Sequence, residues 1–137
     1  MAVKKNIDTQ KDESADCVIK IGDAEYELIF TTKAMKEIYA KYGGITELGE
    51  ILESGGDVGQ MISEIAWVVA LLANQSVLIH NYLNPQDKRE LLTAEAVELL
   101  TNPHEFVELR KLIMPAIYNG MKREVEGEDD EKNRQGG

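Results

Sequence analysis

Apolar residues change their spacing at Thr31, from every second residue before it to every third or fourth residue after it. Before this point, two short runs alternate apolar and polar residues: Cys17, Ile19 and Ile21 in the first, and Tyr26, Leu28 and Phe30 in the second. Gly22-Asp23-Ala24 lies between the runs and has the composition of a tight turn. Alternation with a period of two is typical of half-buried strands, so the sequence predicts a β-hairpin. Because a lone hairpin is marginally stable, its apolar face must rest on helices or its edge must pair with another chain.

Helical periodicity follows, with start and stop signals that divide the rest of the chain. Thr31 or Thr32 is placed to cap a first helix, whose apolar face is predicted to contain Met35, Ile38, Tyr39 and Tyr42. Further helix starts are predicted at Thr46, Asp57, Asn84-Pro85, Thr93 and Asn102-Pro103, and glycine pairs at 43–44 and 55–56 are predicted stops. Pro115 lies inside the last helix, which we expect it to kink or end early.

These patterns predict an α+β fold, with an N-terminal two-stranded β-hairpin followed by a compact bundle of about five or six α-helices. We expect one domain over residues 17–122. Residues 1–16 lack large apolar anchors and mix both charge signs, which favours a flexible N-terminal arm. Residues 123–137 are polar and acidic, and we expect a flexible tail there.

The longest predicted helix begins at Asp57 and contains an apolar run of nine residues, Ile65 to Ala73. A membrane span needs about 20 residues, so we interpret this run as part of a buried central helix. The helix either continues to Leu83 or breaks near Asn74. A single cysteine, Cys17, and an N-terminus without a signal peptide favour a reducing cytoplasm.

The net charge of −10 argues against two classes of partner. A field of this sign repels phosphate backbones, so nucleic acid is an unfavourable partner. It also disfavours adsorption to anionic membranes. The same charge keeps copies of the chain soluble, which suits a protein that binds aggregation-prone partner proteins.

No pattern in the sequence predicts an enzyme. The glycine pairs lack the lysine of a phosphate-binding loop, and the two histidines, His80 and His104, are 24 residues apart without metal-ligand spacing. We therefore predict no catalytic, cofactor-binding or metal-binding residues. Cys17 is interpreted as a small core residue, and His80 as a partly buried, hydrogen-bonded side chain.

An apolar surplus on the central helix, together with methionines on other apolar faces, is the one feature that suggests a binding surface. Methionine suits adaptable grooves that accept helices, although ordinary core packing explains most such residues. The candidate partner-binding residues are Met61, Ile65, Val68, Met114 and Met121.

The stretch from Ile19 to Leu52, IKIGDAEYELIFTTKAMKEIYAKYGGITELGEIL, resembles the opening of tail assembly chaperones from siphophages and prophages of Gram-positive bacteria. The stretch from Ala70 to Thr101 is similar to the later layout of that family. The resemblance covers residues 17–122, and its motifs are structural rather than catalytic.

This resemblance implies a cytoplasmic assembly role in the bacterial host. Such chaperones bind the tape measure protein, keep it soluble, and help recruit tail tube protein during tail morphogenesis. They are not expected in the mature virion. Since many copies coat one client, the resemblance also implies a homo-oligomer. The alternative is a structural virion component such as a head–tail connector protein.

Overall fold

The computed structural model of this chain describes residues 17–54 and 56–136. It begins with an antiparallel hairpin formed by β1 (Cys17–Ile21) and β2 (Ala24–Leu28), in which Ile21 lies opposite Ala24. Gly22 occupies the turn with a φ of 63°, in the left-handed region that a glycine adopts without strain. Because Ile19, Ile21 and Leu28 are buried, the predicted alternation of the hairpin is confirmed.

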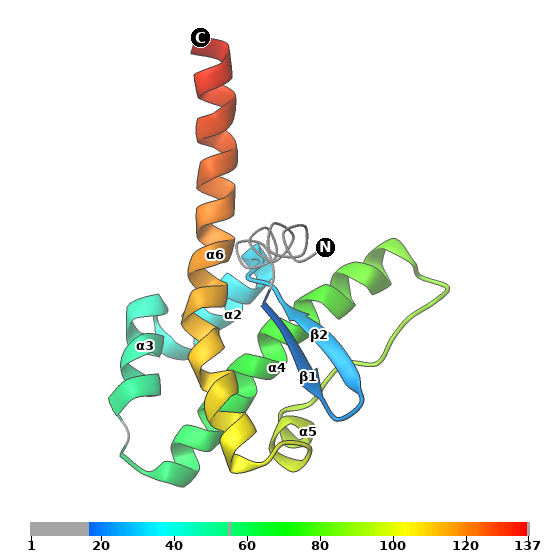
Figure 1. Cartoon of the computed structure of the whole chain (residues 1–137), viewed down its shortest axis with the longest axis vertical. Coiled ribbons are helices and arrows are strands. Elements are labelled where there is room, and N and C mark those ends of the chain that lie inside the picture. The colour runs from blue at the N-terminus through cyan, green and yellow to red at the C-terminus, as the bar shows by residue number, and fades with distance from the viewer. Residues whose placement is uncertain (1–16, 55, 137) are drawn as a thin grey trace, which may run out of the picture.

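Five helices follow the hairpin in the described residues, which confirms the predicted α+β fold (Figure 1). Their bounds are α2 (Thr32–Tyr42), α3 (Ile45–Ser54), α4 (Val58–Leu83), α5 (Ala94–Leu99) and α6 (Pro103–Gly136).

The central helix α4 organises the core. It contacts the hairpin, α2, α3, α5 and α6, and nine of its residues are buried. The residue that follows β2 bonds to the backbone of α4, since the amide of Ile29 donates to the carbonyl of Leu72 at 3.2 Å. By length and composition α4 could also cross a membrane, but half of its most apolar stretch is buried by the other elements. That burial is typical of a core helix.

Thr31 fixes the junction between the hairpin and the helices. Its Oγ1 accepts a hydrogen bond from the amide of Ala34 at 3.0 Å, which caps α2 as the sequence predicts. The same hydroxyl donates to Oε1 of Gln75 at 2.5 Å, and Nε2 of Gln75 donates to the carbonyl of Leu71. Gln75 is 2% exposed, so these bonds satisfy the one polar side chain that the described core buries.

The predicted face of α2 is confirmed at Ile38 and at Tyr42, which packs against the core, but it is wrong at Met35 and Tyr39. Ala34 and Ile38 are fully buried, whereas Met35 and Tyr39 are 38% and 50% exposed. The small Ala34, which the periodicity did not assign to this face, takes the buried position instead.

No helix begins at Asn84-Pro85, contrary to the sequence prediction. Asn84 instead ends α4, where its amide donates to the carbonyl of His80 at 2.8 Å. Residues 84–93, which we call the strap, run back along α4 without helical structure. Side chains of α4 hold the strap by its backbone: Asn74 bonds to Leu92, Asn81 to Arg89, and His80 to the carbonyl of Asp87.

Pro115 does not end α6, which continues through it to Gly136. The expected tail at residues 123–137 therefore has a helical backbone up to Gly136, and this part extends beyond the rest of the domain (Figure 1). The expected arm, residues 1–16, lies outside the described residues, as do Gly55 and Gly137.

Candidate binding surfaces

An apolar groove lies between the N-terminal parts of α4 and α6. It has a volume of about 400 Å³ and is open to solvent. Three of its apolar residues are well exposed: Val58 at 66%, Ile62 at 36% and Val107 at 45%. Its other lining residues are Met61, Ile65, Glu98, Thr101, Asn102, Pro103, Phe106 and Arg110. We call this surface the groove.

The start of α6 is fixed beside the groove by a reciprocal capping box. The side chain of Asn102 accepts from the amide of Glu105 at 2.8 Å, and the side chain of Glu105 accepts from the amide of Asn102 at 2.9 Å. Thr101 ties the preceding turn to α5 by donating to the carbonyl of Val97 at 2.7 Å. The wall that presents Pro103, Phe106 and Val107 is therefore anchored before the first turn of the helix.

The five predicted partner-binding residues do not form one surface. Met61 and Ile65 both line the groove, and Ile65 is 2% exposed at its floor. Val68 is fully buried, so its assignment to a binding surface is wrong. Met114 lies in a separate hollow between α3 and α6, and Met121 lies in a third hollow beside Phe30. Val68 is buried because other elements surround α4 on several sides, and Met114 and Met121 lie apart from the groove because they are further along α6.

Sequence reasoning missed the exposed residues of the groove. Val58 and Ile62 are one turn apart on α4, outside the stripe that packs into the core. The spacing of that pair was the signal from which an exposed apolar surface could have been predicted. The sequence around Val107 carried no such signal, because its exposure depends on how α6 crosses α4.

A second exposed apolar surface lies at the other end of α4. Ile79, Tyr82 and Leu83 are 43%, 86% and 68% exposed, and they share one helix face through their spacing of three and four residues. We call these three residues the tip. The strap turns back immediately after them, so they stand at one edge of the molecule (Figure 1).

A polar cluster joins α2 to α4 at a half-buried position. The hydroxyl of Tyr42 donates to Oε1 of Glu64 at 2.6 Å, and Nζ of Lys41 lies 3.5 Å from the same oxygen. Nζ also sits 5.0 Å from the ring centroid of Trp67, which meets the Tyr42 ring edge to face at 5.9 Å. The hydrogen bond from Tyr42 holds the pKa of Glu64 below its ordinary value, and burial raises the pKa of Tyr42. Because each polar group in the cluster has a partner, the cluster is best explained as a contact that holds α2 against α4.

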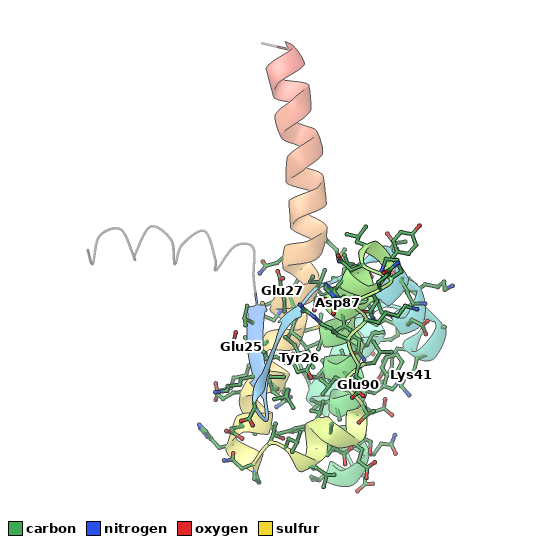
Figure 2. All side chains as sticks on the ribbon, turned by 90° about the vertical axis from the view of Figure 1, so that its right-hand side faces the viewer. Glu25, Tyr26, Glu27, Lys41, Asp87 and Glu90 are labelled. Carbon is green, nitrogen blue, oxygen red and sulfur yellow. The ribbon has the colours of Figure 1, made fainter. Side chains whose placement is uncertain are left out.

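Charged side chains of both signs lie where β2 faces the strap. Figure 2 shows Glu25, Tyr26 and Glu27 of β2 on the same side of the molecule as Asp87 and Glu90. A hollow of about 290 Å³ lies here, and Ser76, Val77 and Arg89 complete its lining together with Ala24, Glu25, Tyr26 and Glu90. Arg89 lies in the same lining and Lys20 lies opposite Glu25 across the hairpin, so this side carries charges of both signs.

The residues considered for chemistry are dispersed. Among the side chains that the structure describes, those of residues 17–53 and 56–121, no three His, Cys, Asp or Glu residues converge as metal ligands would. Nε2 of His80 is 2.7 Å from the carbonyl of Asp87 and 3.4 Å from its carboxylate, so this histidine is hydrogen-bonded as expected. Cys17 is half-buried on β1, and His104 is exposed at the start of α6.

Comparison of this chain with protein-family models, curated proteins and solved structures finds no match.

Proposed function

We propose that this protein is a phage tail assembly chaperone that binds the tape measure protein in the host cytoplasm. In this role it keeps the apolar, helical client soluble, helps recruit tail tube protein, and leaves before the virion is complete. The resemblance over Ile19–Leu52 supports the proposal, because that stretch forms one continuous unit of hairpin, α2 and α3.

The groove is the observation that carries the proposal. Helices α4 and α6 form most of its walls, seven of its eleven lining residues are apolar, and its volume of about 400 Å³ falls in the range of sites that bury a ligand. A groove of this kind accepts the apolar face of an amphipathic helix through side chains at helical spacing. Met61 at its floor is half-buried and has a flexible side chain that adapts to different partners.

The net charge of −10 supports the same proposal. An apolar client helix aggregates with its own copies unless its surface is covered. A strongly acidic cover keeps the complex apart from other complexes through mutual repulsion. The groove supplies the contact, and the charged residues outside it keep the complex in solution.

Co-expression tests the proposal. The tape measure protein of the same phage or prophage should remain soluble with this chain and should precipitate without it. The recovered complex should contain several copies of this chain and should persist at raised salt, because the contacts are apolar. If the client precipitates equally in both cases while this chain is found at fixed copy number in purified particles, the chaperone proposal fails. A structural virion component then replaces it.

A further inference from the structure

Three hollows lie one after another along α6, and each has this helix as one wall. The first is the groove. The second, of about 340 Å³, lies against α3, and the third, of about 50 Å³, lies beside the start of α2. One face of α6 passes all three, because its residues follow one another at intervals of three and four. We call this face the α6 stripe, and it consists of Val107, Arg110, Met114, Tyr118 and Met121.

The α6 stripe is accessible along its length. Val107, Tyr118 and Met121 are 45%, 55% and 42% exposed, and Arg110 and Met114 are half-buried. At 1.5 Å per residue, Val107 and Met121 lie about 21 Å apart along the helix. Helices pack against each other through residues at intervals of three and four, so this length and spacing suit a second helix lying alongside α6.

Arg110 is the one charged residue of the α6 stripe, and it is held in place without being neutralised. Its Nε donates to the carbonyl of Leu52 at 3.0 Å, one of the carbonyls that the end of α3 leaves without a helical partner. The N–H groups on its two Nη atoms remain as further donors. Arg110 takes part in none of the ion pairs among the side chains that the structure describes. Glu53 and Glu98, which line the second hollow and the groove, are exposed and are not among its partners.

We propose that the α6 stripe binds an amphipathic client helix that carries an aspartate or glutamate within its apolar face, and that Arg110 binds this carboxylate. This assignment rests on the proposed function and specifies the chemistry of its client. A wholly apolar helix over the stripe would bury the charge of Arg110 without a partner, which is unfavourable. A carboxylate on the client supplies that partner, and the planar guanidinium matches its two oxygens.

Arg110 then sets the register of the client helix. One polar pair in an otherwise apolar seam fixes how two helices align, because any other alignment buries an unpaired charge. The net charge of −10 repels acidic segments at long range, so a carboxylate is favourable only where it meets Arg110. Salt screens a partly buried pair less than an exposed one, so the complex still persists at raised salt.

Overlapping peptides from the tape measure protein of the same phage or prophage test the assignment. Each should be roughly 30 residues long, which exceeds the stripe and allows a helix to form. Fluorescence anisotropy measures the binding of each labelled peptide to the full chain, to Arg110→Gln and to Lys111→Gln. Lys111→Gln is the matched control, because the Lys111 side chain is 66% exposed and already pairs with Glu108 at 3.2 Å. Single Asp→Asn and Glu→Gln replacements in each bound peptide then locate the carboxylate.

We expect one such amide replacement to weaken binding to the wild type roughly 10- to 100-fold, as for the loss of a hydrogen bond to a charged group. The same replacement should leave binding to Arg110→Gln unchanged, because the partner of the carboxylate is already absent. It should weaken binding to Lys111→Gln as much as binding to the wild type. Thermal melts verify the fold of both variants, and the loss measured with the wild-type chain remains a test if Arg110→Gln unfolds.

Two results overturn the role of Arg110 while leaving the proposed function intact. In the first, peptides bind but every amide replacement is tolerated, which means that a group of this chain neutralises Arg110. In the second, the sensitive replacement weakens binding to Arg110→Gln as much as binding to the wild type, so its partner is another residue. Failure of every peptide to bind also overturns the assignment, and co-expression with the whole tape measure protein then decides the proposed function separately.

Discussion

Asn81 holds Arg89 through both ends of its side-chain amide: Nδ2 donates to the carbonyl of Arg89 at 3.0 Å, and Oδ1 accepts from its amide at 2.8 Å. Asn74 makes the same pair of bonds with Leu92, at 2.7 Å each. Seven residues of helix advance about 10.5 Å, and three residues of extended chain advance about 10 Å. The spacing of Asn74 and Asn81 along α4 therefore matches the spacing of Leu92 and Arg89 along the strap, so each asparagine lies beside its partner.

Replacing these asparagines should loosen the strap. We expect Asn74→Ala to lower the free energy of unfolding by ~1–3 kcal/mol, because it leaves both backbone groups of the buried Leu92 without their partner. Asn81→Ala should cost less, because water can replace its exposed bonds. Urea denaturation measures both variants, and hydrogen exchange should accelerate at the amides of Leu92 and Arg89 respectively. Unchanged exchange at those amides would contradict this account of the strap.

The close approach of α6 to the hairpin's end makes Gly120 sensitive to substitution. A Cβ at this position would lie 2.8 Å from the Cβ of Phe30 and 3.1 Å from its carbonyl oxygen. Gly120→Ala should therefore destabilise the fold by ~1–3 kcal/mol through overpacking. Gly49→Ala on α3 is the matched control, since the nearest atom to its Cβ is Cε of Met114 at 3.9 Å. The control should gain up to ~1 kcal/mol from helix propensity. Equal stability of the two variants in urea would count against the packing described.

The bond between Tyr42 and Glu64 predicts a pH-dependent contribution to stability. Because the folded state lowers the pKa of Glu64, the ionised carboxylate stabilises the fold above its ordinary pKa of 4.5. That contribution is lost as the pH falls below this value through the lowered pKa. Tyr42→Phe should cost ~1–2 kcal/mol at neutral pH, and its difference from the wild type should shrink in acid. Denaturation at several pH values measures this, and a difference that grows in acid would have the wrong sign. Glu64→Gln, alone and with Tyr42→Phe, isolates the pair.

Sequence reasoning located most elements because their signals are local. The hairpin depends on alternation and a glycine turn. Thr31, Thr93 and Asn102 cap α2, α5 and α6, and each side chain accepts a hydrogen bond from the amide three residues further on. It failed at Asn84-Pro85, where local chemistry resembles a helix start. In the strap that follows, Asn81 binds the backbone of Arg89 and Asn74 binds that of Leu92. These partners are 8 and 18 residues apart in the sequence, so no local pattern reveals them.

The groove was only partly predictable for a related reason. The surplus of apolar residues on α4 was visible in the sequence, and Met61 and Ile65 do line the groove. Which of these residues stay exposed depends on where five other elements cover α4. Val68 has the same residue type as Val58, yet one is fully buried and the other is 66% exposed. Tertiary packing alone separates them.

A pull-down of the tape measure protein with two matched valine variants tests the central claim most directly. Val107→Asp places a charge on the groove wall, and Val18→Asp places the same charge on β1, outside the groove, at a comparable exposure of 55% against 45%. Both variants should remain within ~0.5 kcal/mol of the wild type, as surface substitutions usually do. The account predicts that Val18→Asp retains the client at raised salt and that Val107→Asp loses it. Retention of the client by Val107→Asp at the wild-type level would contradict the account.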